Sequence, residues 1–93
     1  MKLVYSESAI RDLQRLREFI AEHDPATAAS VAAGLVERLE KLTAFPRLGV
    51  PVRHAPDPET VRDLILDDYT VRYSCHAEMI VVLRLWHHRE QRN

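Results

Sequence analysis

The chain has 93 residues, of which 46% are hydrophobic and 29% are charged, and its formal net charge is −1 at pH 7. These values predict one small globular domain over residues 1–93, with no room for a second hydrophobic core. The charge excludes a general nucleic-acid coat protein, which would carry a marked basic excess, so we expect no sequence-specific nucleic-acid binding by the chain alone.

The N-terminal residues, the lengths of the apolar runs and the single cysteine bear on where the protein is found in the cell. The first residues, MKLVYSESAIRDL, lack the apolar centre of a signal peptide, and no apolar run approaches the length of about 18 residues that a membrane span needs. The single cysteine, Cys75, has no partner for an internal disulfide and lies in a strand pattern, which predicts a buried thiol. We expect a cytoplasmic protein without membrane association or cofactor.

The chain begins with a predicted strand over residues 2–5 and a helix over residues 7–23. Ser6 or Ser8 is suited to cap this helix, and Glu7 lies near the positive end of its dipole. Apolar residues recur at helical spacing, which indicates an amphipathic helix whose charged residues form a solvated face. The apolar stripe comprises Ile10, Leu13, Leu16, Phe19 and Ile20.

A second helix is predicted over residues 25–43. Asp24 suits its N-cap, and Pro25 suits the first helical position, where the missing N–H costs nothing. Gly34 lies in its middle at a cost of about 1 kcal/mol relative to alanine, which favours a tight helix–helix contact at that point. We therefore expect a helical hairpin packed on a sheet. Its apolar face comprises Ala28, Val31, Ala32, Leu35, Leu39 and Leu42.

Residues 44–60 are expected to form a proline-rich loop, in which residues 49–54 have the composition of an added edge strand. Three strands follow over residues 61–66, 69–76 and 79–87, and their short turns require antiparallel pairing. The last strand is apolar on both faces apart from Arg84, as a central strand would be. The predicted fold is α+β with the order β-α-α-β-β-β, an antiparallel-rich sheet and a two-helix hairpin on one face.

Four arginines and a tryptophan lie on or beside these strands, and two interpretations remain open for them. They form either a solvated face with salt bridges to Asp63, Asp67 and Asp68, or a patch for an acidic partner or a phosphate. Trp86 suits either stacking against a partner or packing within the hairpin. The candidate partner-binding residues are Arg62, Arg72, Arg84, Trp86 and Arg89.

Metal binding and cysteine catalysis are not indicated. His87 and His88 are adjacent on a strand, so their side chains point to opposite faces and do not share one ion. Cys75 lacks an activating base, because His76 faces the other way. His88 has the chemistry of a general acid or base, but a solvent-exposed strand end is the simpler interpretation.

The order and spacing of short motifs along the whole chain resemble the RelE/ParE family of toxins from bacterial type II toxin–antitoxin modules. No single motif is diagnostic, and the match depends on their succession over 93 residues. The motifs are Ser8-Ala9 with Leu13, Leu42-x-x-Phe45-Pro46-x-x-Gly49, Val61-Arg62-x-Leu64, Tyr69-x-Val71-x-Tyr73, Ile80-Val81-Val82-Leu83 and His87-His88-Arg89.

The resemblance is greater to the ParE branch than to the RelE branch. ParE-like members poison DNA gyrase, and the resemblance implies an inhibitor neutralised by a ParD-type antitoxin encoded beside it, in a hetero-oligomeric complex. Such antitoxins thread a helix and a strand around the toxin, which suits an apolar groove along the hairpin and sheet.

RelE-like members cleave mRNA in the ribosome, and their resemblance implies Arg62 and Arg89 on phosphate and His88 in proton transfer. Thr70 stands where the nuclease has an arginine, and no tyrosine or histidine follows Arg89 before the chain stops. These departures weaken the endoribonuclease alternative, since they remove basic and acid groups that the cleavage needs. A third alternative is an inactive member that only binds antitoxin.

Overall fold

A computed structural model describes residues 1–57 and 60–90 of the chain. The helices are α1 (Glu7–His23) and α2 (Ala28–Leu39), and a 3-10 turn, η1 (Glu40–Thr43), continues α2. The strands are β1 (Lys2–Tyr5), β2 (Val50–Pro51), β3 (Val61–Leu66), β4 (Tyr69–Cys75) and β5 (Met79–His87).

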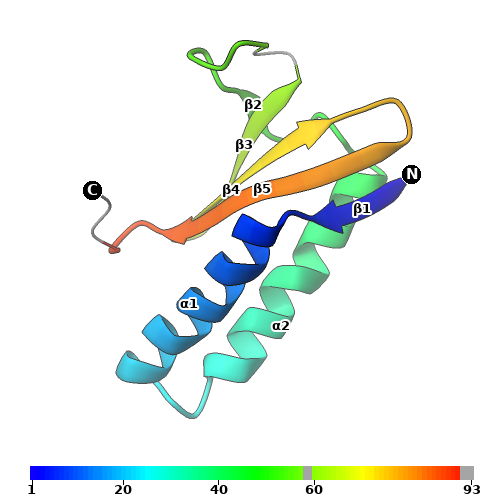
Figure 1. Ribbon diagram of the computed structural model, residues 1–93. Coiled ribbons are helices and arrows are strands. Elements are labelled where there is room, and N and C mark those ends of the chain that lie inside the picture. Colours follow the sequence, from blue (N-terminus) through cyan, green and yellow to red (C-terminus); the bar gives the residue numbers. More distant parts are fainter. Residues whose placement is uncertain (58–59, 91–93) are drawn as a thin grey trace.

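The strands form one five-stranded sheet in the order β1-β5-β4-β3-β2 (Figure 1). β1 runs parallel to β5, and every other neighbouring pair is antiparallel. Both helices lie on one side of the sheet, with α1 next to β1 and β5 (Figure 1). The α+β fold and the central position of the last strand are therefore confirmed.

The first helix forms where its capping residue and apolar stripe place it. The Ser6 hydroxyl accepts a hydrogen bond from the Ala9 N–H at 3.0 Å, which satisfies one of the unpaired donors of the first turn. Ala9, Leu16 and Ile20 are buried against the sheet, and Ile10 is 48% exposed, so the buried stripe is narrower than expected.

The second helix begins later than predicted. Asp24 ends α1, because its backbone N–H bonds to the Ile20 carbonyl, and it is therefore not available as the N-cap of the next helix. Pro25 lies in the turn between the helices, and α2 starts at Ala28 after Thr27. The tight contact expected at Gly34 is also wrong, since a Cβ built there meets nothing within 4 Å.

The loop after η1 folds back over the sheet. The Tyr73 hydroxyl, on a fully buried ring, donates to the Pro46 carbonyl and accepts from the Gly49 N–H, both at 2.8 Å. A Cβ at Gly49 would lie 2.8 Å from the Asp63 carbonyl oxygen, so this close approach requires glycine. The loop then adds β2 as an edge strand, shorter than residues 49–54.

The core lies between the helices and the sheet, and β4 departs from simple alternation. Tyr73 and Val71 are fully buried on the helix side, but Thr70 and Ser74 on the other face are also only 5% and 7% exposed. The strand ends at Cys75, one residue earlier than predicted. The buried core cluster comprises Ala9, Leu16, Leu35, Leu39, Leu42, Leu64, Leu66, Val71, Tyr73, Ile80, Val82 and Leu85.

Candidate functional site

Arg62 does not join the other candidate arginines. Its position opposite Tyr73 places it on the helix side of the sheet, where it is 7% exposed. Its guanidinium donates to the Gly49 carbonyl at 2.9 Å, so it fastens the loop that covers Tyr73. The predicted patch of four arginines is therefore not formed, because the period of two along β3 sends this side chain to the covered face.

Arg72 lies on the opposite face, which we call the open sheet face, and its charge is already paired. Two hydrogen bonds of 2.8 and 2.9 Å join its guanidinium to the Asp63 carboxylate on the neighbouring strand. The same guanidinium lies over the Trp86 ring, 5.3 Å from the ring centroid. The hydrogen bonds to Asp63 raise the pKa of Arg72 although burial opposes this, so the group stays cationic.

His88 lies near this face, and the structure pairs it with a hydroxyl. Its Nε2 and the Thr70 hydroxyl are 2.7 Å apart, while its ring remains exposed. Thr70 stands opposite Trp86 in the register of β4 and β5. A threonine in this position offers a hydroxyl to the imidazole but no charge to a phosphate.

Arg84 reaches around the sheet edge to a buried carboxylate that sequence reasoning assigned to a solvated helix face. Asp12 is 2% exposed and accepts hydrogen bonds from Arg84 at 2.8 Å and from the Leu85 N–H at 2.9 Å. Arg15 also donates to Asp12, and it bonds Glu90 at 2.6 Å and the Leu85 carbonyl at 2.9 Å. We call Asp12, Arg15, Arg84 and Glu90 the edge network. The one signal in the sequence was the spacing of three between Asp12 and Arg15.

The edge network favours the charged form of both its acids. Burial opposes ionisation of Asp12, but the hydrogen bonds from Arg84, the Leu85 N–H and Arg15 together lower its pKa. The pKa of Glu90 is lowered in the same way, with burial outweighed by the Arg15 guanidinium and the His87 N–H. Hydrogen bonding to Glu90 is the main reason that the pKa of Arg15 is raised.

The network also closes one edge of the central strand. Val82 pairs with Tyr5, the last residue of β1, and beyond it a register irregularity places Arg84, rather than Leu83, opposite Arg72. Along the rest of β5, side chains take the place of a neighbouring strand. The four bonds are Ser6 Oγ to Leu83 O, Leu85 N to Asp12 Oδ2, Arg15 to Leu85 O, and His87 N to Glu90 Oε1, at 2.9 to 3.0 Å.

Arg89 follows His88 directly in the chain, but the two side chains have different surroundings. Its backbone N–H donates to His87 Nδ1 at 3.0 Å, and its side chain borders a cleft at the end of α1. Arg62 is buried under the loop at Gly49, and His88 is bonded to Thr70. These three residues therefore do not converge on one reacting group.

Cys75 is held as a thiol. Its Sγ donates to the Pro46 carbonyl at 3.1 Å, and burial raises its pKa, an effect that Arg62 and Arg47 only partly offset. Its side chain is half-buried rather than fully buried as predicted. Among residues 1–57 and 60–90, no group of three His, Cys, Asp or Glu side chains is placed to hold a metal ion.

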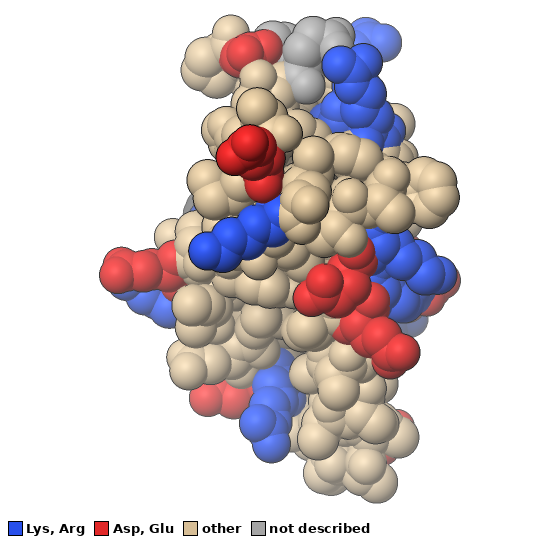
Figure 2. Space-filling model, turned by 90° about the vertical axis from the view of Figure 1, so that its right-hand side faces the viewer, with Lys and Arg blue, Asp and Glu red and all other residues tan. Residues whose placement is uncertain are grey.

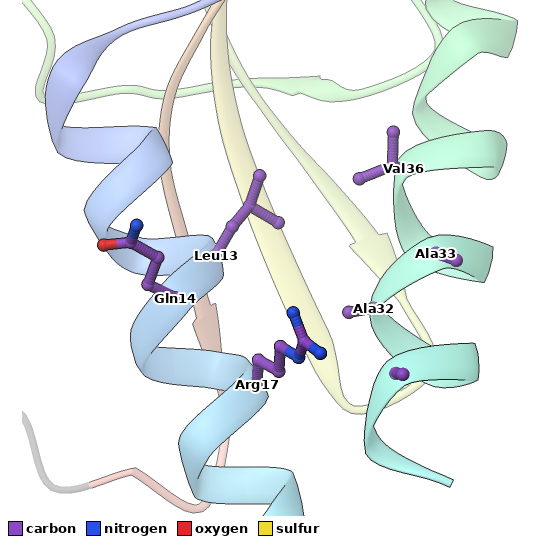
Figure 3. A pocket seen from close by; sticks show the side chains of 7 residues that line it. Leu13, Gln14, Arg17, Ala32, Ala33 and Val36 are labelled. Carbon is purple, nitrogen blue, oxygen red and sulfur yellow. The ribbon is translucent and has the colours of Figure 1, made fainter.

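A groove of about 470 Å³ separates the two helices, and we call it the helical groove. Leu13 and Arg17 of α1 and Ala32 and Val36 of α2 point toward one another across it (Figure 3). The alanines of α2 are too small to fill the space between the helices, so an open apolar channel remains. The groove is lined by Leu13, Gln14, Arg17, Ala29, Ala32, Ala33 and Val36.

The face of the molecule in Figure 2 carries no continuous positive track for a nucleic acid. Acidic and basic side chains are interspersed over the face in Figure 2, rather than gathered into one positive field. The ion pairs Arg38–Asp67, at 2.8 Å, and Arg11–Glu7, at 3.6 Å, also place an acidic group beside a basic one and so reduce the local positive charge. No described helix combines the length and apolar character needed to cross a membrane.

Three known proteins resemble this chain in sequence or in fold. The chain is 32% identical over 94 residues to Toxin RelE1 of Caulobacter vibrioides, covering 97% of this chain and 96% of that protein. The chromosomal ParDE TA system from P. aeruginosa contains a chain with a TM-score of 0.79 and 23% identity, covering 94% of this chain and 95% of that one. The toxin–antitoxin complex RelBE2 from Mycobacterium tuberculosis gives a TM-score of 0.70 at 22% identity, with 96% and 92% covered.

A family model also matches residues 3–92, nearly the whole chain, and it describes the ParE toxin of the type II toxin–antitoxin system parDE. Together with the RelE1 relative and the fold, this match establishes the family that the motifs indicated. The chain belongs to the ParE toxin family of type II toxin–antitoxin systems.

Proposed function

We propose that this toxin inhibits DNA gyrase by binding it as a protein and is held inactive by a cognate ParD-like antitoxin encoded beside it, in a hetero-oligomeric complex. The observation that carries the proposal is the separation of Arg62, His88 and Arg89. A ribonuclease needs a base, an acid and a phosphate-binding cation around one ribose phosphate, whereas these three side chains lie in three different surroundings.

The helical groove is the proposed seat of the antitoxin. Its floor is formed by alanines and by Leu13 and Val36, so an amphipathic helix can insert its apolar residues there. Arg17 at the border offers a cation to an acidic residue of the incoming helix. A groove that small residues keep open needs little rearrangement on binding, which limits the entropic cost of association.

The open sheet face is the proposed second contact. Arg72, Arg84 and Trp86 have paired or stacked side chains, and the side chains of Arg72 and Arg84 are 38% and 45% exposed. At this exposure an ion pair contributes only about 0–1 kcal/mol, so an acidic partner can replace Asp63 at little cost. Arg89 is available at the neighbouring border, whereas Arg62 is not, because its side chain is buried.

The gyrase proposal is tested with purified toxin, DNA gyrase and supercoiled plasmid. We expect toxin-dependent accumulation of cleaved DNA bound to gyrase, and the loss of this product when the antitoxin is added. Alanine at Arg72 and Arg89 together is expected to weaken gyrase or antitoxin binding, and Arg84 is left in place because it pairs with the buried Asp12. If the double variant retains full inhibition and full antitoxin affinity, these two arginines have no role in either contact.

The endoribonuclease alternative has one specific observation in its favour, the name of the relative Toxin RelE1. It is tested with translating ribosomes and a defined mRNA, with primer extension to locate new 5′ ends. Cleavage at the ribosomal A site by the toxin, without any effect on gyrase, would replace the proposed function. Antitoxin binding with neither effect would identify an inactive member.

The role of the helical groove is tested separately by filling it. Ala32→Trp places a large ring in the channel, and we expect the affinity for the antitoxin to fall at least about tenfold, which corresponds to about 1.4 kcal/mol. Ser30→Trp adds the same ring on the same helix at an exposed position outside the groove and serves as the control. Equal affinities of the two variants, by calorimetry, would place the antitoxin elsewhere.

A further inference from the structure

A second cleft, of about 690 Å³, lies at the opposite end of α1 from Ser6, and we call it the ring cleft. Three separate segments meet there: the end of α1 with the following turn, the turn between β3 and β4, and the end of β5. Apart from Arg89, the residues that line it have no part in the functions considered above. The cleft is lined by Phe19, Ile20, His23, Asp24, Thr27, Asp68, Tyr69, His87 and Arg89.

The wall of the ring cleft is a continuous row of rings. Phe19 lies between His23 and His87, with ring centroids 4.8 and 5.1 Å away, and His87 meets Tyr69 edge-on at 4.9 Å. His23 is fixed by a bond of 2.9 Å from its Nδ1 to the Phe19 carbonyl. The rings are tilted by 41° to 86° to one another, so the row offers aromatic faces and edges to a planar or cationic group.

His87 presents a hydrogen-bond donor at this wall. The residue is only 9% exposed, and its Nδ1 accepts the Arg89 N–H, so the proton of the neutral ring lies on Nε2. Within residues 1–57 and 60–90 this Nε2 has no hydrogen-bond partner, and it is not among the fully buried atoms that lack one. A largely buried ring that lines a cleft and has an unpaired donor favours an acceptor at that place.

Two carboxylates beside the rings also lack partners. Among the described aspartates, Asp12, Asp63 and Asp67 are ion-paired and Asp57 accepts from Thr60, whereas the carboxylates of Asp24 and Asp68 have no hydrogen bond or ion pair. The carbonyl end of α1 adds partial negative charge at the same place. Arg89 is the one arginine or lysine in the lining, so the two carboxylates outnumber it and the site favours a cation next to its rings.

We propose that the ring cleft binds an arginine side chain presented by a protein partner. The guanidinium stacks on the row of rings and donates to Asp24 and Asp68, and a backbone carbonyl of the partner accepts from His87 Nε2. Arginine fits better than lysine, because its planar group both stacks and donates in several directions. This site is independent of the target of the toxin, since neither gyrase nor RNA enters the argument.

A polypeptide is favoured over a free cation or a nucleotide. Both carboxylates are exposed, and exposed pairs contribute only about 0–1 kcal/mol each, so a free cation would not be retained. A side chain held by a wider interface has already lost most of its translational freedom. A nucleotide would bring phosphate toward the carboxylates, which repel it.

The proposal is tested on the full chain by NMR, with ¹⁵N-labelled histidine rings and amides as readout. The probe is the capped tripeptide Gly-Arg-Gly, and its matched control contains citrulline, which has the same shape without the charge. We expect the arginine peptide to shift His87 Nε2 and the Tyr69 amide with a dissociation constant of about 1–10 mM, and citrulline to bind at least about threefold more weakly.

Two variants of adjacent residues sharpen the test. Asp68→Asn should weaken the arginine peptide about threefold, whereas Asp67→Asn should leave it unchanged, because Asp67 is turned to Arg38, 2.8 Å away. The proposal is overturned if arginine and citrulline peptides shift His87 equally, if neither does, or if both variants weaken binding alike. Tighter binding of guanosine monophosphate than of the arginine peptide would overturn it too.

Discussion

The two sides of α1 are built in opposite ways. Toward the sheet, Ala9 and Leu16 are buried, and Asp12 binds two arginines and the backbone of β5. Toward α2, Leu13 and Arg17 face alanines across an open channel. The α1–β5 interface is therefore closely packed, whereas the α1–α2 interface contains an open groove.

This difference separates stability from partner binding. The α1–β5 junction is expected to set the free energy of unfolding, since removing a buried charge leaves its partners uncompensated. The helical groove contributes little to the free energy of unfolding, because few atoms of the free protein fill it. Substitutions on the sheet side should therefore unfold the protein, and those on the hairpin side should mainly change its binding.

The largest effect is expected from Asp12→Ala. The change leaves the Leu85 N–H without an acceptor and removes the shared partner of Arg15 and Arg84, so we expect a loss of about 3 kcal/mol in the free energy of unfolding. Urea denaturation measures it. Glu18→Ala, an exposed acid on the same helix, is the control, and a loss as small as in the control would contradict the closed junction.

A smaller loss is expected from Gly49→Ala, where the loop approaches β3. The added methyl group would lie 2.8 and 2.9 Å from the carbonyl oxygen and carbon of Asp63, which belong to backbone and cannot move aside freely. We expect a loss of about 2 kcal/mol, seen as a lower urea midpoint. An unchanged midpoint would mean that the loop lifts from Tyr73 without cost.

The third largest effect is expected from acid, which should lower the free energy of unfolding through the α1–β5 junction. The pKa values of Asp12 and Glu90 are lower in the folded protein than in the unfolded chain, so the folded state binds fewer protons in this range. Their stabilisation is present at neutral pH and is lost as the pH falls below about 4 and through the lowered values. Denaturation between pH 7 and 3 should show this slope, and Asp12→Asn should reduce it; an identical slope in the variant would assign the acid response to other groups.

The smallest effect has the opposite sign. Gly34→Ala adds a methyl group to α2 where nothing lies within 4 Å, so the gain in helix propensity should raise the free energy of unfolding by about 0.5–1 kcal/mol. Thermal denaturation measures the gain. A loss instead would show that the hairpin is packed more closely at Gly34 than at the neighbouring groove.

The order of elements was predictable from the sequence because it depends on local patterns. The Ser6 cap, the stripe of α1 and the period of two in β4 each act over a few residues. The start of α2 was not predictable in this way. Asp24 and Pro25 have the residue types of a helix start, but the Asp24 N–H donates to the Ile20 carbonyl, so Asp24 ends α1 instead of starting α2.

The candidate site was less accessible to sequence reasoning. The side of the sheet on which Arg62 and Arg72 lie follows from pairing register, which a single strand does not reveal. Asp12 looked like a solvated acid, because the strand edge that it binds is more than 70 residues away in the chain. The ring cleft combines three distant segments, so no local motif marks it.

The side chains that border β5 beyond Tyr5 also bear on how copies of the protein meet. An uncovered strand edge is a template on which another chain can add its own strand, and this is a common route to aggregation. Here Ser6, Asp12, Arg15 and Glu90 occupy the hydrogen-bonding groups of that edge. A strand of another copy therefore cannot pair with this part of β5, which disfavours edge-to-edge aggregation along it.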